Sequence, residues 1–223
     1  MRVLLCGASS LRAREKPASL RRILRRCAVI CDRGGGGGSR CPRLQCVLGA
    51  VPPEFCKGVL LVLQLQEETE ADWWEVEALF DLCFAPGREA LSSYRLRDGV
   101  APVAGLCLVA RDDDGVLGGA IRYWPVQVGG APALLLGPVA VHPTRQGEGL
   151  GAWLIRDSLH RAADAGWQRA MLVGDAPYYG RFGFDRLEGV EMPPPTNPDR
   201  VLGRALVPGG WDGVRGAVTR AEP

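Results

Sequence analysis

Apolar and polar residues follow regular periods from about residue 59 onward. Residues 59–66 form an aliphatic run typical of a strand, and Thr69 with Asp72 three positions later has the spacing of a helix N-terminus. Over residues 73–83, apolar side chains recur three and four positions apart, which predicts an amphipathic helix. We expect a second, shorter helix over residues 88–97.

A β-hairpin is predicted in the middle of the chain. Residues 106–111 and 116–128 have strand composition and flank a polar turn at 112–115, which holds three aspartates and a glycine. Gly129-Gly130 then permits a tight reversal. We therefore expect residues 131–142 to pair antiparallel with residues 116–128.

The period changes to that of a helix after this hairpin. Apolar residues predict a helix over 149–165 with Gly166 at its C-terminal cap, and a short buried strand follows over 169–174. A strand–helix–strand crossover is right-handed and makes strands 131–142 and 169–174 parallel. Residues 201–207 supply a closing strand. The pattern predicts an α/β (α+β) fold, a mixed and mostly antiparallel sheet of six to seven strands with flanking helices.

Composition divides the chain near residue 60. The 223 residues have a formal charge of +2, but residues 1–60 carry a net charge of +9 and residues 61–223 a net charge of −7. Six of the eight cysteines also lie in the first segment. We therefore predict three parts, which are a leader over 1–58, a folded domain over 59–215 and a tail over 216–223.

The leader contains five consecutive glycines at 34–38, which lose much backbone entropy on ordering and are typical of a linker. Residues 18–31 place apolar and arginine residues on opposite helix faces, as in an organelle transit peptide or a helix that binds an anionic membrane or nucleic acid. A metal site lacks paired C-x2-C spacing, and disulfides would need a secretory signal. We expect a disordered leader without chemistry, which translation upstream of the native start would explain.

Charge and hydropathy exclude some classes of partner. No apolar run reaches the roughly 20 residues of a membrane-spanning helix. The acidic balance of residues 61–223 disfavours a nucleic-acid surface and favours a cationic or amine partner. We expect a cytoplasmic monomer or homodimer with no membrane or nucleic-acid partner.

The most informative stretch is Arg145-Gln146-Gly147-Glu148-Gly149-Leu150-Gly151, between a predicted strand and a predicted helix. Alternating glycines at a helix start expose backbone N–H groups to an anion such as pyrophosphate, and Arg145 adds charge at the rim. A P-loop would need a lysine, and none follows Lys57. A dinucleotide fingerprint would need an acidic residue about 20 positions on. Asp175 lies 28 positions after Gly147 instead.

The segment Gln146-Gly147-Glu148-Gly149-Leu150-Gly151 resembles the acetyl-CoA signature of the GNAT superfamily of N-acetyltransferases. The resemblance extends over about residues 61–210. It includes the strand Leu136-Gly137-Pro138-Val139-Ala140-Val141 and the later Tyr178-Tyr179-Gly180-Arg181-Phe182-Gly183-Phe184. The wording Gly174-Asp175-Ala176-Pro177-Tyr178-Tyr179 is similar to the bacterial YhbS-like branch.

This resemblance implies a GNAT-like sheet that splays at the parallel pair 131–142/169–174 to admit acetyl-CoA as the acyl-donor cosubstrate, without a metal. A proline inside an apolar strand independently argues for a bulge at Gly137-Pro138. The resemblance assigns cofactor binding to the turn and to free backbone N–H groups of the strand: Val139, Val141, Arg145, Gln146, Gly147, Glu148, Gly149, Leu150 and Gly151.

The resemblance also implies that Tyr179 is the general acid that protonates the departing CoA thiolate. The general base stays open. His142 is interpreted as a turn residue and His160 as a solvated one, while Glu77 and Asp81 share a helix face on the substrate side.

The predicted activity is transfer of acetyl from acetyl-CoA to a primary amine of a small molecule or protein, directly within a ternary complex. The acceptor pocket is expected from the two helices after the first strand and from residues 189–200. The alternative is a non-catalytic acyl-CoA-binding sensor or scaffold module, since both readings require the same glycine turn.

Overall fold

The computed structural model describes residues 2–6, 60–84 and 87–221 of the chain. Most of the predicted leader, residues 7–58, lies outside the described residues. Arg2–Cys6 forms strand β1 and takes the position next to β2 (Leu60–Glu67) in the sheet order. Of the predicted leader the structure thus describes this strand alone, and the boundary near residue 58 stays a prediction.

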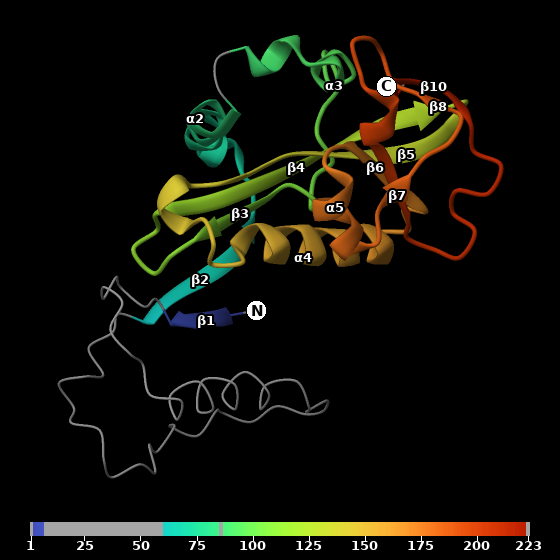
Figure 1. The fold of residues 1–223 in the computed structure, drawn as a ribbon. Helices are drawn as coiled ribbons and strands as arrows, with labels where there is room; N and C mark the ends of the chain where they lie inside the picture. The colour runs from blue at the N-terminus through green and yellow to red at the C-terminus, as the bar shows by residue number, and fades with distance from the viewer. Residues whose placement is uncertain (1, 7–59, 85–86, 222–223) are drawn as a thin grey trace, which may run out of the picture. The chain divides into compact units, whose positions relative to one another are not determined.

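One mixed sheet organises the described part of the chain (Figure 1). Its main path runs β1-β2-β3-β4-β5-β6-β9-β7, and β10 pairs with β4 and with β8 off this path. The remaining strands are β3 (Leu108–Arg111), β4 (Leu117–Val128), β5 (Ala131–Val141), β6 (Arg169–Val173), β7 (Asp185–Arg186), β8 (Val190–Glu191), β9 (Val201–Ala205) and β10 (Gly216–Arg220). The pairs β5–β6 and β8–β10 are parallel, and the other pairs with a described register are antiparallel.

Helices cover both faces of this sheet (Figure 1). Helix α4 (Leu150–Asp164) packs Leu154, Ile155 and Leu159 into the larger core on one face, while α2 (Trp73–Phe84) packs Val76 and Phe80 on the other. Successive residues of β4 serve the two faces in turn because side chains alternate across a strand. The shorter helices are η2 (Glu70–Asp72), η3 (Arg88–Ala90), α3 (Ser92–Arg95), η4 (Pro143–Arg145), α5 (Ala176–Tyr179), η5 (Gly180–Phe182) and η6 (Pro198–Arg200).

The predicted capping signal is confirmed. Asp72 Oδ2 accepts hydrogen bonds from the Thr69 backbone N–H at 2.8 Å and from the Thr69 hydroxyl at 2.7 Å. These contacts close the turn η2 immediately before α2.

The single helix expected over residues 88–97 is wrong. Leu91 is extended, with ψ 141°, and separates η3 from α3. Side chains on both pieces bond to distant elements, since Arg88 pairs with Asp81 of α2 and the Ser92 hydroxyl contacts the Thr196 hydroxyl at 2.6 Å. Tertiary contacts thus override the local helical period here.

The tail expected over 216–223 begins instead with strand β10. Val218 pairs with Val128 and Arg220 with Val126, so β10 extends the sheet along the edge of β4 beyond the end of β3. The contact is close, because a β-carbon on Gly216 would lie 3.2 Å from the Gly129 α-carbon. The structured domain therefore continues past residue 215.

The predicted splay between the two parallel strands is confirmed. Strands β5 and β6 pair only at Leu134 with Ala170 and at Leu135 with Met171. Beyond Leu135, β5 continues to Val141 without a partner on this side, since β6 turns to pair with β9 along its full length. A gap in the ladder therefore opens at the end of β5 that leads to the glycine turn.

Candidate functional site

A β-bulge interrupts β5 where its pairing with β6 stops. Ile121 pairs with Val139 and Tyr123 with Leu136, so Arg122 alone faces two residues, Gly137 and Pro138. Gly137 has φ 119°, a value that a residue with a side chain rarely adopts. The predicted bulge is thus present, and it offsets the strand segment that follows it.

The bulge leaves two backbone donors unused by β4. The His142 N–H donates to the Gly118 carbonyl at 2.9 Å, and donors alternate between the two edges of an antiparallel strand. By this alternation the Ala140 N–H also faces β4, while the N–H groups of Val139 and Val141 face the edge from which β6 has separated. An acceptor group in this gap can bond to both.

The glycine turn joins the end of β5 to α4. Gly147 has φ 85° and Gly149, the N-cap of α4, has φ 83°. A β-carbon at either position would meet no described atom within 4 Å, so the backbone conformation, rather than space, requires glycine here. The first N–H groups of α4 have no partner within the helix and lie at the positive end of its dipole, which favours an anion.

The third glycine of the turn serves a close approach. A β-carbon on Gly151 would lie 3.3 Å from Val141 Cγ2 and 3.5 Å from the Tyr178 hydroxyl oxygen. The missing side chain thus lets the end of β5 and helix α5 both lie against the start of α4.

Two side chains of the turn are engaged in contacts within the protein. Arg145 pairs with Asp112 at 2.6 Å, and the other Asp112 oxygen accepts from the Val116 N–H at 2.9 Å. Asp112 is therefore a buried anchor between the β3–β4 hairpin and the turn. Gln146 Nε2 donates to the Val141 carbonyl at 3.2 Å. The Glu148 carboxylate lies 4.0 Å from Arg145, and its Oε2 has no hydrogen-bond partner among the described residues, so the bonds of Arg145 and Gln146 are the contacts that brace the turn.

Tyr179 lies at the other end of the gap. Its ring is edge-on to Tyr178 at 4.9 Å and to Phe184 at 6.1 Å between centroids. A β-carbon on Gly174 would collide with this ring, so the glycine makes room for it. Burial, and secondarily Tyr178, raises the pKa of Tyr179 to about 12. The phenol is therefore protonated at neutral pH and is a donor.

The structure brings Tyr179 and Val139 into one cavity. This cavity of about 130 Å³ is also lined by the bulge residues Gly137 and Pro138. The glycine turn lies along the same open edge of β5, and Tyr178 links it to Tyr179. The described contacts thus join Val139 and Tyr179 through one cavity and Tyr178 to the glycine turn, while the assignment of these residues to one site stays a prediction.

The other titratable candidates do not line the small cavity. His142 Nδ1 contacts the Thr144 hydroxyl at 2.7 Å, as expected for a turn residue. His160 is exposed on α4. Glu77 and Asp81 both pair with Arg88, Asp81 at 2.6 Å.

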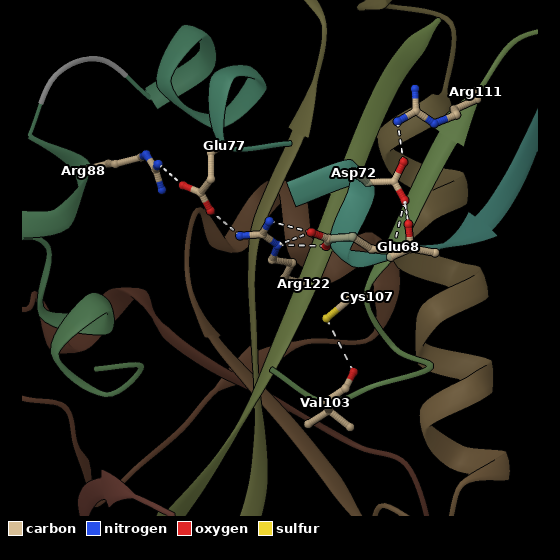
Figure 2. Close-up of polar contacts among 9 residues, drawn as sticks. Glu68, Asp72, Glu77, Arg88, Val103, Cys107, Arg111 and Arg122 are labelled. Carbon is tan, nitrogen blue, oxygen red and sulfur yellow. Dashed lines mark hydrogen bonds and ion pairs between the residues drawn. The ribbon is translucent and has the colours of Figure 1, made fainter. Parts of the chain in front are cut away.

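A buried ion network lies beside the bulge, and Figure 2 shows how its side chains converge. Arg122, opposite the bulge on β4, contacts both oxygens of Glu68 at 2.5–3.0 Å and also pairs with Glu77. Glu77 in turn pairs with Arg88, which donates to the Tyr94 hydroxyl at 2.6 Å. Arg122 is 5% exposed, so its charge depends on these carboxylates.

A second, larger cavity of about 960 Å³ adjoins this network. It meets the smaller cavity at three shared residues, Tyr94, Arg97 and Pro138. Glu68, Arg88, Arg97 and Arg122 are not predicted from the sequence. The one available signal was Arg122, the only charged residue in the predicted strand 116–128.

Neither a membrane-spanning helix nor a metal-binding cluster occurs among the described residues. No helix in this part of the chain is long and apolar enough to cross a membrane. No group of three or more His, Cys, Asp or Glu side chains within the described ranges is arranged to hold a metal ion.

Comparisons with known proteins agree with this architecture. Residues 104–186 match the family model described as an acetyltransferase (GNAT) domain. The uncharacterized N-acetyltransferase YhbS of Escherichia coli (strain K12) is 32% identical over 112 residues, which are 49% of this chain and 66% of that protein. This chain thus spans slightly less than two thirds of the length of that relative.

Two solved structures are similar over most of their length. The GNAT family N-acetyltransferase YhbS from Escherichia coli, in complex with CoA, has a TM-score of 0.63 and 28% identity, covering 72% of this chain and 90% of that one. A GNAT family acetyltransferase from Brucella melitensis, in complex with acetyl-CoA, has a TM-score of 0.54 and 32% identity, covering 71% and 96%. These similarities show that the chain, with its open parallel pair, bulged strand and glycine turn, belongs to the GNAT family of acetyltransferases.

Proposed function

We propose that this protein is an N-acetyltransferase that moves an acetyl group from acetyl-CoA to a primary amine directly within a ternary complex. The observation that carries the proposal is the open edge of β5. There the unpaired N–H groups of Val139 and Val141, the protonated Tyr179 and the glycine turn follow one another along a single gap. The relatives with bound CoA or acetyl-CoA support the choice of cosubstrate.

The residues of the gap fit this cosubstrate. Gly147 and Gly149 keep the turn free of side chains, and the N–H groups at the start of α4 suit a pyrophosphate. We assign cofactor binding to this turn and to the two β5 donors: Val139, Val141, Arg145, Gln146, Gly147, Glu148, Gly149, Leu150 and Gly151. Because Arg145 pairs with Asp112, its role is to hold the turn in place, and its guanidinium lies at the rim of the turn.

In the reaction, acetyl-CoA supplies an activated acyl group as a thioester. The N–H groups of Val139 and Val141 are placed to hold the pantetheine chain and to stabilise negative charge on the thioester oxygen. Tyr179 donates its phenolic proton to the thiolate that departs. Glu77 and Asp81 are both engaged by Arg88, so neither is assigned as a general base and the amine proton is released to water.

The proposal is tested by following free thiol release from acetyl-CoA across a panel of small amines, amino acids and peptides. Calorimetric titration with CoA is run on the same preparations. Acceptor-dependent thiol release would support the transferase. CoA binding at micromolar affinity without thiol release from any acceptor would favour the alternative, a sensor or scaffold module. The proposal includes a small molecule or protein as the amine acceptor, a monomeric or homodimeric state and a cytoplasmic location.

Replacing Gly149 with alanine tests the turn itself. A β-carbon at φ 83° costs about 1–2 kcal/mol although space is free around it. We expect the free energy of unfolding of the CoA-bound protein to fall by this amount. If the turn changes conformation to accommodate the alanine, contacts with CoA are lost, and if it does not, the backbone remains strained. The measurement is denaturant unfolding with saturating CoA.

Gly180 is the matched control for this substitution. It has φ −56° and no described atom within 4 Å of a β-carbon, so Gly180→Ala is expected to be neutral or slightly stabilising. Equal unfolding free energies for the two CoA-loaded variants would contradict a required left-handed backbone in the turn.

A further inference from the structure

Arg97 differs from the other arginines near the bulge. Its guanidinium carbon lies 4.2 Å from the ring centroid of Tyr94 and 4.7 Å from that of Trp124. These cation–π contacts stabilise the charge but accept no hydrogen bond in the plane of the guanidinium. The N–H groups of Arg97 therefore need another acceptor.

Within the described part of the chain that acceptor is missing. Arg97 Nε and Nη1 are inaccessible to solvent and have no hydrogen-bond partner there. The neighbouring Arg88 and Arg122 are each neutralised by carboxylates, namely Glu77, Asp81 and Glu68. Burial, together with these two like charges, lowers the pKa of Arg97 to about 10, so it stays charged at neutral pH. Buried guanidinium N–H groups without an acceptor are unfavourable unless a ligand supplies one.

The position of Arg97 indicates what completes it. Arg97 lines both the small cavity that contains Tyr179 and the large cavity next to the ion network. Its Nη2 would lie 3.8 Å from a β-carbon built on Gly137, the first residue of the bulge. An anion bound at Arg97 would thus lie beside the strand segment that carries the Val139 N–H.

Most of the other charges around the large cavity lie in ion pairs, whereas Glu89 and Arg95 line it without an ion pair among the described residues. Glu68, Glu77, Arg88 and Arg122 form one network, and Asp98 lies 3.6 Å from Arg220. The positive charge of Arg97 is in none of these ion pairs, and it lies at the point where the two cavities meet. A single carboxylate balances it and matches a guanidinium in shape.

We propose that Arg97 binds the carboxylate of the acceptor, and that the acceptor is a small amino acid whose amine is separated from that carboxylate by one or two carbons. This inference rests on the proposed function. The amine and the carboxylate must be close together because Arg97 lies next to the bulge. A carboxylate bound to Arg97 then leaves the amine of the same molecule beside the thioester. Transfer forms a bond from the amino nitrogen to the acetyl carbonyl carbon and breaks the carbon–sulfur bond. The ammonium group loses two protons: one accounts for the proton that converts the CoA thiolate to a thiol, and the other enters solvent.

The test compares acceptors in matched pairs. Thiol release is measured for α-amino acids and β-alanine against their carboxamides, and for 4-aminobutyrate and 6-aminohexanoate as longer homologues. The wild type is expected to give kcat/KM at least about tenfold higher for each productive acid than for its amide, and lower values as the chain lengthens. Arg97→Gln is expected to abolish this preference by lowering kcat/KM for the acids alone. Arg97→Lys keeps the positive charge but not the planar, bidentate guanidinium, and it is expected to retain part of the preference for acids over amides.

Arg156→Gln is the control, because Arg156 is exposed on α4, lies 5.4 Å from the Phe182 ring centroid and lines neither cavity. It is expected to keep the acid preference. Circular dichroism and CoA affinity check that each variant folds and binds the cosubstrate. A wild type that prefers amides, or an Arg97→Gln variant that loses acids and amides equally, would overturn the inference.

A binding measurement separates this inference from the proposed function. N-acetylglycine and N-acetyl-β-alanine are titrated into the CoA-loaded protein beside their carboxamides. If the wild type binds the acids and Arg97→Gln does not, the carboxylate site is supported. This holds even if no acceptor causes thiol release, and only the transferase proposal would then fail. Equal binding of acids and amides would refute the carboxylate site whatever the turnover.

Discussion

Tyr179→Phe is expected to lower kcat about 100-fold or more while the dissociation constant of CoA stays within about twofold. The ring would keep its contacts with Gly174 and Phe184, and only the phenolic proton would be lost. Without that proton the thiolate leaves as an anion into a partly buried gap. The measurement is steady-state thiol release under saturating substrates, with calorimetric titration of CoA on the same variant.

The pH profile adds a second readout. Since the pKa of Tyr179 is raised to about 12, the donor form is fully populated below that value. Wild-type kcat is therefore expected not to fall between about pH 8 and 10 through loss of this proton. A fall with an apparent pKa near that of an ordinary phenol would contradict the assignment.

Tyr178→Phe is the matched control for Tyr179→Phe, because the two rings are neighbours in α5 and only Tyr179 lines the small cavity. We expect kcat of the Tyr178 variant to remain within about fivefold of wild type, since the general-acid contribution of about 100-fold or more is retained. The opposite ranking of the two variants would exclude Tyr179 as the acid.

Gly174→Ala tests whether the position of the Tyr179 ring matters beyond its chemistry. A β-carbon there would collide with the ring and would lie 2.7 Å from Leu172 Cδ1. The ring must shift, and a shift of about 1 Å can cost about 100-fold in rate. We expect a large fall in kcat in a protein that still folds and binds CoA. Unchanged kcat would mean that the ring position is not critical.

Arg122→Met is expected to lower the free energy of unfolding by about 3 kcal/mol, because it leaves buried carboxylates without their cation. Glu68 is 8% exposed and loses its only described ion-pair partner, and Glu77 keeps Arg88 alone (Figure 2). For a domain of this size the melting temperature should fall by about 6–12 °C. The measurement is calorimetric or denaturant unfolding without ligand.

Arg186→Met supplies the comparison for that substitution. The Arg186–Asp199 pair has a similar contact of 2.8 Å, but its side chains are 59% and 67% exposed. Solvent screens such a pair, so the loss is expected to stay below about 1 kcal/mol. Equal losses in the two variants would contradict the role of burial. A Glu68→Gln, Arg122→Met double variant should lose less than the sum of the two single variants, since the residues contact each other.

The sequence by itself determined the features that arise from neighbouring residues. Strand and helix periods, the Thr69–Asp72 cap, the glycines that require positive φ and the bulge at Gly137-Pro138 all follow from local backbone and side-chain chemistry. The crossover rule extended this to the parallel pair β5–β6. The resemblance of the glycine turn to a known family supplied Tyr179, whose role remains a prediction.

Only the tertiary structure decided which distant groups meet. Strand β10 pairs where β4 outlasts β3, a length relation that no local pattern contains. Arg122 reaches Glu68 across 54 residues of sequence, and the described groups packed around Arg97 leave its Nε and Nη1 without an acceptor. The free energy of a charge depends on its burial and on its neighbours in space, so the sequence contained these residues but not their chemistry.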